Sequence, residues 1–230
     1  MIIVVTGARK GIGRYLSEYY LEKGYIVIGC SRKDTDLKSD NYHHYQVDVT
    51  NEKDVNEFAN FVRKKFSKID ALINNAGAAS MNHFLLTPAS TAQRLIELNY
   101  IGAYHCVRAF INLLKKSDNP RIVNFSTIAV PLALSGEIAY VASKSAVEAF
   151  TKVLAKEISQ FSITVNAIGP TPVETDLIKN VPSQKMKDLI SQQAINRMGK
   201  FSDVSNVIDF FISPASDFIT GQIIYLGGIS

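Results

Sequence analysis

The 230-residue sequence has only two cysteines, four histidines and no long hydrophobic run. Cys30 and Cys106 lie far apart and form no CxxC pair, so we expect reduced, buried thiols and no disulfide. The histidines lack metal-ligand spacing with each other and with the cysteines, so we expect no metal. The apolar run after Met1 is too short for a signal-peptide core or a membrane span. We therefore expect a cytoplasmic protein with no membrane partner.

Charge of one sign is not concentrated in any part of the sequence. The 25 basic and 21 acidic residues give a net charge of +4, and they are spread along the chain. A nucleic-acid partner would require a basic run or stripe, so we expect none. With 47% hydrophobic residues, the length suits a single domain spanning 1–230.

Short β-branched runs alternate with longer segments of helical period, which predicts βα units and a parallel sheet. We expect seven strands, at 2–6, 25–30, 44–48, 70–74, 121–126, 163–168 and 222–227. We expect helices at 11–23, 51–66, 88–116, 137–160, 175–195 and 202–213. The pattern predicts a doubly wound α/β domain that binds its ligand beyond the carboxyl ends of the strands.

A glycine-rich loop, TGARKGIG at 6–13, follows the first expected strand and opens the first expected helix. Its glycines, Gly7, Gly11 and Gly13, have the spacing GxxxGxG. Glycines let the backbone approach a pyrophosphate, and a helix N-terminus offers unpaired N–H groups with partial positive charge. The loop therefore predicts a dinucleotide site, the alternative being a glycine-rich turn that binds nothing.

The end of the second expected strand carries no carboxylate to hold the 2′-hydroxyl of an NAD ribose. GCSRK places Ser31 and Arg32 there, and we expect Arg9 and Lys10 at the same ribose corner. A 2′-phosphate would meet cations and a serine hydroxyl. We therefore predict NADP(H) rather than NAD(H); the nearby Asp34 opposes this, and a solvated basic loop is the alternative.

Two Tyr-x-x-x-Lys pairs occur, Tyr19 with Lys23 and Tyr140 with Lys144. On a helix this spacing places the phenol and the ammonium on one face. The spacing alone does not say which pair is functional, because ten tyrosines make the pattern common by chance.

The glycine loop, NNAG at 74–77 and YVASK at 140–144, in this order, resemble the motifs of the classical short-chain dehydrogenase/reductase family. The resemblance covers the whole chain. It implies a Rossmann-type, doubly wound parallel sheet with strand order 3-2-1-4-5-6-7 and helices on both faces. It also implies that Tyr140 is the proton donor and acceptor, while Lys144 binds the nicotinamide ribose and lowers the pKa of the phenol.

The resemblance implies two further catalytic groups. Asn99, in ELNYIG, matches the active-site asparagine of the family. The family's serine, thirteen residues before the tyrosine, corresponds to Thr127, whose hydroxyl has the same reach but whose methyl group crowds the site. Ser126, one residue earlier, is the alternative.

The cofactor residues implied by the resemblance extend beyond the glycine loop. Asp48 and Val49 would hold the adenine, Asn75 to Gly77 the adenosine ribose, and Val173 and Thr175 the nicotinamide carboxamide. Thr171 stands where the family usually has glycine. The full set is Gly7, Arg9, Lys10, Gly11, Ile12, Gly13, Ser31, Arg32, Asp48, Val49, Asn75, Ala76, Gly77, Tyr140, Lys144, Pro170, Val173 and Thr175.

These residues predict an NADPH-dependent reductase that converts a ketone or aldehyde to an alcohol by hydride transfer. The alternative is an NADP(H)-binding sensor or scaffold without redox chemistry, which the departures at Thr127 and Thr171 favour. The substrate is a small molecule of open identity, a 3-oxoacyl thioester, a small ketone or a sugar-like compound, and its loop is expected near 176–200. The resemblance implies a homotetramer or a homodimer.

Overall fold

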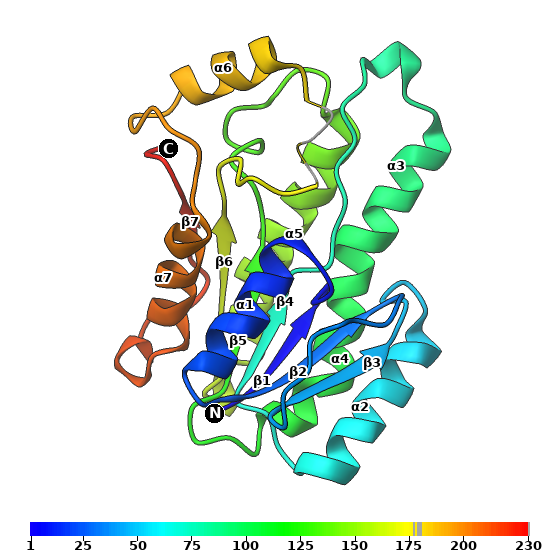
Figure 1. The fold of residues 1–230 in the computed structure, drawn as a ribbon, viewed down its shortest axis with the longest axis vertical. Coiled ribbons are helices and arrows are strands. Elements are labelled where there is room, and N and C mark those ends of the chain that lie inside the picture. Colours follow the sequence, from blue (N-terminus) through cyan, green and yellow to red (C-terminus); the bar gives the residue numbers. More distant parts are fainter. Residues whose placement is uncertain (177, 179–180, 230) are drawn as a thin grey trace.

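The computed structural model describes residues 1–229 except 177, 179 and 180. A parallel seven-stranded sheet forms its centre, in the order β3-β2-β1-β4-β5-β6-β7 (Figure 1). The strands are β1 (Ile2–Thr6), β2 (Ile26–Ser31), β3 (Tyr42–Gln46), β4 (Ala71–Asn74), β5 (Arg121–Phe125), β6 (Thr164–Gly169) and β7 (Ile223–Tyr225). The predicted strand count, order and parallel direction are confirmed.

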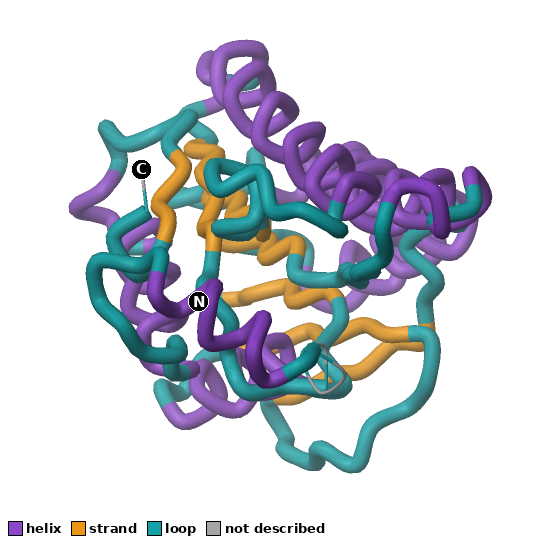
Figure 2. The backbone as a smooth tube through the Cα atoms, turned by 90° about the horizontal axis from the view of Figure 1, so that it is seen from above, coloured by secondary structure: helices purple, strands orange, loops and turns teal. Residues whose placement is uncertain are grey.

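Helices cover both faces of the sheet (Figures 1 and 2). The helices are α1 (Gly11–Glu22), α2 (Glu52–Phe66), α3 (Ala89–Ile96), α4 (Gly102–Leu114), α5 (Ile138–Glu157), α6 (Ser183–Ser191) and α7 (Phe201–Ile212), with short 3-10 turns η1 (Phe84–Leu86), η3 (Ser159–Phe161) and η4 (Pro214–Ser216). None of the helices in the described part of the chain is long and apolar enough to cross a membrane.

The core is divided by the sheet because successive side chains of a strand point to opposite faces. On one face, Val4 of β1 packs in a cluster with residues of α2, α4 and α5. On the other face, Ile3 and Val5 pack with residues of α1 and α7. Burial on both faces explains why the central strands are almost continuously apolar.

Two predicted helices differ from the structure. The helix expected at 88–116 is interrupted by one π-helical turn, η2 (Glu97–Ile101), which has Asn99 at its centre. The helix expected at 175–195 is wrong in extent, since α6 begins only after Pro182. Pro182, the N-cap residue, has no backbone N–H and therefore fits the start of a helix but not its interior. Residues 177, 179 and 180 of that range lie outside the described residues.

Both cysteines are buried and free. Within the described residues, no group of three or more His, Cys, Asp or Glu side chains could hold a metal ion.

Candidate functional site

The glycine-rich loop between β1 and α1 forms a cradle that only glycine can line. Gly7 and Gly11 have φ of +69° and +59°, which favour glycine over other residues. A Cβ on Gly13 would lie 2.4 Å from the carbonyl oxygen of Gly7, so a side chain at this position would push α1 away from the glycine loop. Among the described residues, no side chain caps the N-terminus of α1 and no acidic residue occupies its first turn. The loop therefore fits the phosphates of a dinucleotide.

The NNAG segment after β4 is tied to the end of β1. The Thr6 hydroxyl oxygen accepts hydrogen bonds from the backbone N–H of Asn75, at 3.0 Å, and of Ala76, at 2.9 Å. The side chain of Asn75 donates to the carbonyl oxygen of Thr6 at 2.9 Å. The neighbouring strands thus hold Asn75 and Ala76 beside the glycine loop.

Asn99 links three elements at the carboxyl edge of the sheet. Its Oδ1 accepts from the N–H of Ala78 at 2.9 Å, and its Nδ2 donates to the Ala78 carbonyl at 3.0 Å. Nδ2 also lies 2.8 Å from Oγ of Ser143, on α5. A Cβ on Gly77 would lie 2.9 Å from Asn99 Oδ1 and 3.4 Å from Lys144 Nζ. Asn99, Gly77 and Lys144 therefore converge, and the π-helical turn places Asn99 there.

Tyr140 and Lys144 lie one turn apart on α5 and are both buried. The ammonium of Lys144 donates to the carbonyl oxygen of Phe125, the last residue of β5, at 2.7 Å. The hydroxyl of Thr127 faces the Tyr140 phenol and favours its ionised form. The structure thus brings together the four predicted catalytic residues, Asn99, Thr127, Tyr140 and Lys144.

The electrostatics of this pair are governed by burial. Burial raises the pKa of Tyr140 to about 12, against the opposing hydrogen bond from Thr127. Burial lowers the pKa of Lys144 from 10.5 to about 8. Both shifts favour the neutral forms, because a charged group is poorly solvated in the interior. A positive charge placed against the phenol would be needed to bring its pKa toward neutrality.

Ser126 and Thr127 are adjacent but point to different partners. The Ser126 hydroxyl donates to the buried carboxylate of Glu148, which also accepts from the Tyr225 hydroxyl at 2.7 Å. The Thr127 hydroxyl oxygen instead accepts from the Ala129 N–H at 3.2 Å and lies beside Tyr140. Of the two, Thr127 is therefore the hydroxyl that faces Tyr140.

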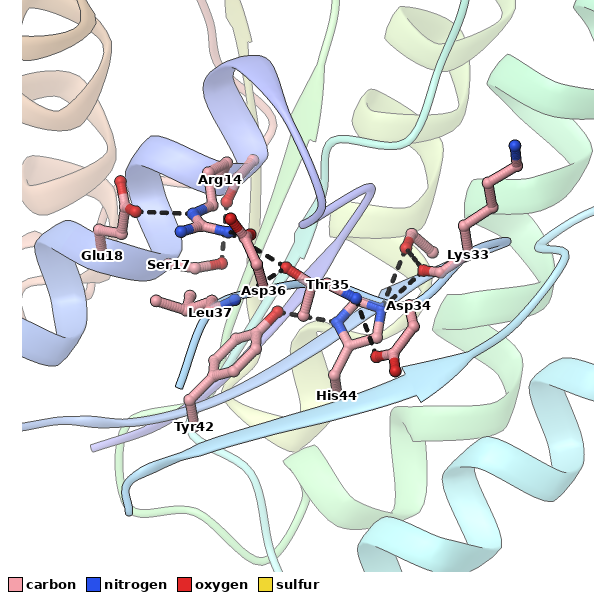
Figure 3. A network of polar contacts seen from close by, with 12 residues as sticks. Arg14, Ser17, Glu18, Lys33, Asp34, Thr35, Asp36, Leu37, Tyr42 and His44 are labelled. Atoms are coloured by element: carbon pink, nitrogen blue, oxygen red, sulfur yellow. Dashed lines mark hydrogen bonds and ion pairs between the residues drawn. The ribbon is translucent and has the colours of Figure 1, made fainter. Parts of the chain in front are cut away.

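The ribose corner after β2 is built by a polar network (Figure 3). Arg14 donates to Glu18 at 2.6 Å and to Thr35 at 3.1 Å, and pairs with Asp36, so it anchors the chain after β2. Arg9 and Arg32 are exposed, and Lys10 pairs with Asp176 at 3.1 Å. The predicted cations thus lie at the surface, but Lys10 is directed to the segment after β6 and not to the end of β2, where the sequence analysis expected it.

Two residues of this polar network, Arg14 and His44, were not singled out by the sequence analysis. His44 Nε2 lies 3.0 Å from Ser31 Oγ, and Nδ1 lies 2.8 Å from the Tyr42 hydroxyl. Arg14 could have been found as the basic residue directly after GIG. No sequence pattern around His44 indicates these contacts, because Ser31 and Lys33 belong to the neighbouring strand β2 and the segment after it.

The adenine-side residues are fixed by local contacts. The carboxylate of Asp48 accepts from the N–H of Thr50 at 3.0 Å and from its hydroxyl at 2.8 Å. Val49 packs against α4, where a Cβ on Gly102 would lie 2.7 Å from its Cγ2. Both are held beyond the carboxyl end of β3.

The segment after β6 crosses in front of the glycine loop. The Pro170 carbonyl accepts from the Ile128 N–H at 3.3 Å, and Val173 forms a β-bridge with Gly199. The side chain of Thr175 lies 3.5 Å from where a Cβ on Gly11 would stand. Thr171, the departure from the family pattern, donates its hydroxyl to Gln193 at 2.7 Å. Its side chain therefore anchors the chain that follows α6.

The second Tyr-x-x-x-Lys pair is an ion-pair site between helices. The Tyr19 hydroxyl donates to Asp209 of α7 at 2.6 Å, and the Lys23 ammonium lies 2.5 Å from the same oxygen. Neither group reaches the carboxyl edge of the sheet.

Comparisons with known proteins agree with this geometry. A family model described as short chain dehydrogenase matches residues 1–186. The 3-oxoacyl-(acyl-carrier-protein) reductase FabG of Vibrio cholerae is 27% identical over 99% of this chain and 96% of its own. The chloroplastic NADPH-dependent aldehyde reductase 2 of Arabidopsis thaliana is 31% identical over 99% of this chain and 92% of its own.

Two solved structures share the fold at a TM-score of 0.89 and 30% identity. One is the ligand-free aldohexose dehydrogenase of Thermoplasma acidophilum, and the match covers 99% of this chain and 93% of that one. The other is ElxO with NADP bound, where the match covers 98% of this chain and 96% of that one.

Proposed function

Because the chain belongs to the short-chain dehydrogenase family, we propose that it is an NADPH-dependent oxidoreductase that reduces a ketone or aldehyde to an alcohol. The observation that carries the proposal is the convergence of Asn99, Thr127, Tyr140 and Lys144 beside the glycine cradle. Groups from a π-helical turn, the end of β5 and α5 meet there, where a doubly wound sheet binds its ligand.

Thr127 and Tyr140 act on the substrate oxygen. Both side chains are buried and their hydroxyls face each other, so a carbonyl oxygen placed between them would accept two hydrogen bonds. Tyr140 gives its proton to that oxygen as the carbonyl carbon becomes tetrahedral. Bound NADPH supplies the hydride for this step and carries a positive ring once oxidised.

Lys144 holds the nicotinamide ribose and passes a proton back to Tyr140. Its ammonium is fixed by the Phe125 carbonyl and stands one turn from the phenol, next to Gly77 and Asn99. With a pKa near 8 it is mostly protonated at neutral pH and can release a proton there. Asn99 positions this end of α5 through Ser143.

The raised pKa of Tyr140 suits the proton donor of a reduction. A pKa raised to about 12 keeps the phenol protonated at every physiological pH. Reduction consumes this proton, which the phenol holds before the substrate binds. The site as built is therefore a proton donor.

The proposed cofactor is NADP(H). The end of β2, which would meet a 2′-phosphate, carries the Ser31 hydroxyl and the exposed cation Arg32, and Arg9 is an exposed cation of the glycine loop. One relative is named as NADPH-dependent, and one structural neighbour is described with NADP bound. The names of the relatives span acyl, aldehyde and sugar chemistry, so the proposed substrate class is a ketone or aldehyde, which includes 3-oxoacyl compounds.

The proposal extends to a homodimer or homotetramer joined through α4 and α5. Val153 on α5 is 54% exposed, and the rings of Tyr100, Tyr104 and Phe150 form a cluster beside it. Such apolar groups on long helices favour association with a second copy. Light scattering of the purified protein tests this assembly.

The experiment for the activity measures NADPH absorbance with a panel of ketones, aldehydes and 3-oxoacyl thioesters, comparing wild type with Tyr140→Phe. Turnover should fall at least a hundredfold, roughly the value of one acid–base group, while NADPH binding stays near wild type. Tyr19→Phe is the matched control, since its ring belongs to the other Tyr-x-x-x-Lys pair and should leave turnover unchanged. Near-normal reduction by Tyr140→Phe would refute the assignment.

A further inference from the structure

We propose that His44 is a positioning residue for cofactor choice. When a 2′-phosphate binds, His44 Nε2–H donates to the Lys33 carbonyl in place of the Ser31 hydroxyl, and the Ser31 hydroxyl is then free to donate to the phosphate. The inference deepens the proposed function and rests on its NADP(H) preference. His44 stands on β3, opposite Gly29 of β2.

Four polar groups form one chain of contacts behind the ribose corner (Figure 3). The Tyr42 hydroxyl lies 2.8 Å from His44 Nδ1. His44 Nε2 lies 3.0 Å from Ser31 Oγ and 3.1 Å from the Lys33 carbonyl oxygen. The Ser31 hydroxyl donates to that same carbonyl at 2.5 Å. Three groups therefore meet within hydrogen-bond distance of one another: the imidazole, the serine hydroxyl and the Lys33 carbonyl.

The position of the imidazole proton follows from these partners. A carbonyl oxygen can only accept, so Nε2 must carry the hydrogen to face the Lys33 oxygen favourably. Nδ1 is then an acceptor, and the Tyr42 hydroxyl donates to it. Burial raises the pKa of Tyr42 and lowers the pKa of His44, which keeps both groups neutral. The chain of donors runs from Tyr42 through His44 to the Ser31 corner.

This arrangement decides what Ser31 can offer a ligand. A serine hydroxyl has one hydrogen, and here that hydrogen is used on the Lys33 carbonyl. Because His44 Nε2–H is within reach of the same oxygen, the carbonyl stays satisfied when the Ser31 hydroxyl turns outward. A phosphate needs donors, and a donor to a charged oxygen is worth more than one to a neutral oxygen. The 2′-hydroxyl of NAD(H) gains much less.

The pocket that holds the imidazole is built for it. A Cβ on Gly29 would lie 2.2 Å from the Tyr42 hydroxyl and 2.8 Å from Ala8 Cβ, so only glycine leaves room for the phenol under His44. Around it, Arg14 fixes the chain that follows Lys33 through Thr35 and Asp36. His44 is thus held in one orientation before a ligand arrives.

The test compares the binding of 2′,5′-ADP and 5′-AMP to the full-length protein by calorimetry, which isolates the 2′-phosphate from turnover. His44→Gln places an amide N–H near the Nε2 position, while His44→Asn reaches only the Nδ1 position. We expect His44→Asn to weaken 2′,5′-ADP binding about tenfold, or about 1.4 kcal/mol, and His44→Gln to stay within about threefold of wild type. Binding of 5′-AMP should be the same in both, which shows an intact adenosine site.

His43→Gln is the matched control. The neighbouring imidazole contacts Lys65 and Phe66 instead, and this change should leave both affinities at the wild-type value. If His44→Asn keeps the wild-type ratio of the two affinities, the role of His44 is refuted. If His44→Gln and His44→Asn lose selectivity equally, the donor role is also refuted. A wild type that does not distinguish 2′,5′-ADP from 5′-AMP would refute the NADP(H) proposal itself.

Discussion

Replacing Lys144 by methionine should change how the stability of the fold depends on pH. The lysine is 5% exposed, and burial lowers its pKa from 10.5 to about 8. Between these two values the unfolded chain holds a proton that the folded chain has released. Raising the pH through this window therefore stabilises the wild type. Methionine has nearly the same shape and no proton to lose.

The magnitude follows from the two pKa values. At about 1.4 kcal/mol for each pH unit, burial of the charged lysine costs about 3 kcal/mol below pH 8. About 2.5 kcal/mol of this is recovered between pH 7 and pH 10. Loss of the hydrogen bond to the Phe125 carbonyl costs Lys144→Met a further amount of about 1 to 3 kcal/mol, the same at both pH values.

The assay is urea unfolding of wild type and Lys144→Met at pH 7 and pH 10, without nucleotide. The free energy of unfolding of the wild type, minus that of the variant, should rise by about 2.5 kcal/mol between the two. Lys23→Met is the control, because Lys23 pairs with Asp209 and its pKa is raised, so its difference should stay flat over this range. A flat difference for Lys144→Met would refute the buried, easily deprotonated lysine.

Two further predictions concern the hydroxyl pair and the glycine cradle. Thr127→Val should lower kcat at least tenfold, while Thr127→Ser should keep kcat within a few fold of wild type. Ser126→Ala should retain kcat but lose about 1 to 3 kcal/mol of stability, because the carboxylate of Glu148 loses a hydrogen-bond donor. Steady-state assays and urea unfolding measure both, and a larger kcat loss in Ser126→Ala than in Thr127→Val would reverse the assignment. Gly13→Ala should abolish calorimetric NADPH binding or lower the melting temperature, since its methyl group would meet the Gly7 oxygen at 2.4 Å; an unchanged affinity and melting temperature would contradict the fit of the cradle.

The fold could be predicted from the sequence because the strand signals are strong. Buried parallel strands read as β-branched runs, and β1, β4 and β5 fall close to the expected positions. The strand predicted at 44–48 lies at Tyr42–Gln46, because pairing with β2 sets its register. The π-helical turn at Glu97–Ile101 has no signal in residue type, since it depends on side-chain contacts to other elements.

Some residues of the candidate site could likewise be predicted from the sequence, and others could not. Tyr140, Lys144 and Asn99 could be placed because their motifs match those of a known family, and the structure brings them together. The choice between Ser126 and Thr127 could not be made from adjacent hydroxyls. It depends on Glu148, which lies on α5 and accepts from Ser126. Contacts between residues far apart in the sequence leave no local pattern.

The π-helical turn also fixes the angular phase of the helices on either side of it. Each residue of an α-helix turns the chain by about 100°, and a π-helical turn absorbs one extra residue without rotating the flanking helices by that angle. Loss of one residue within 97–101 would therefore leave Leu95 packed against Ala139 and Tyr140 but would move Asn99 away from the Ala78 backbone that it contacts. Natural length variation in related chains is therefore expected to avoid this turn and to collect in surface connections such as the one before α6.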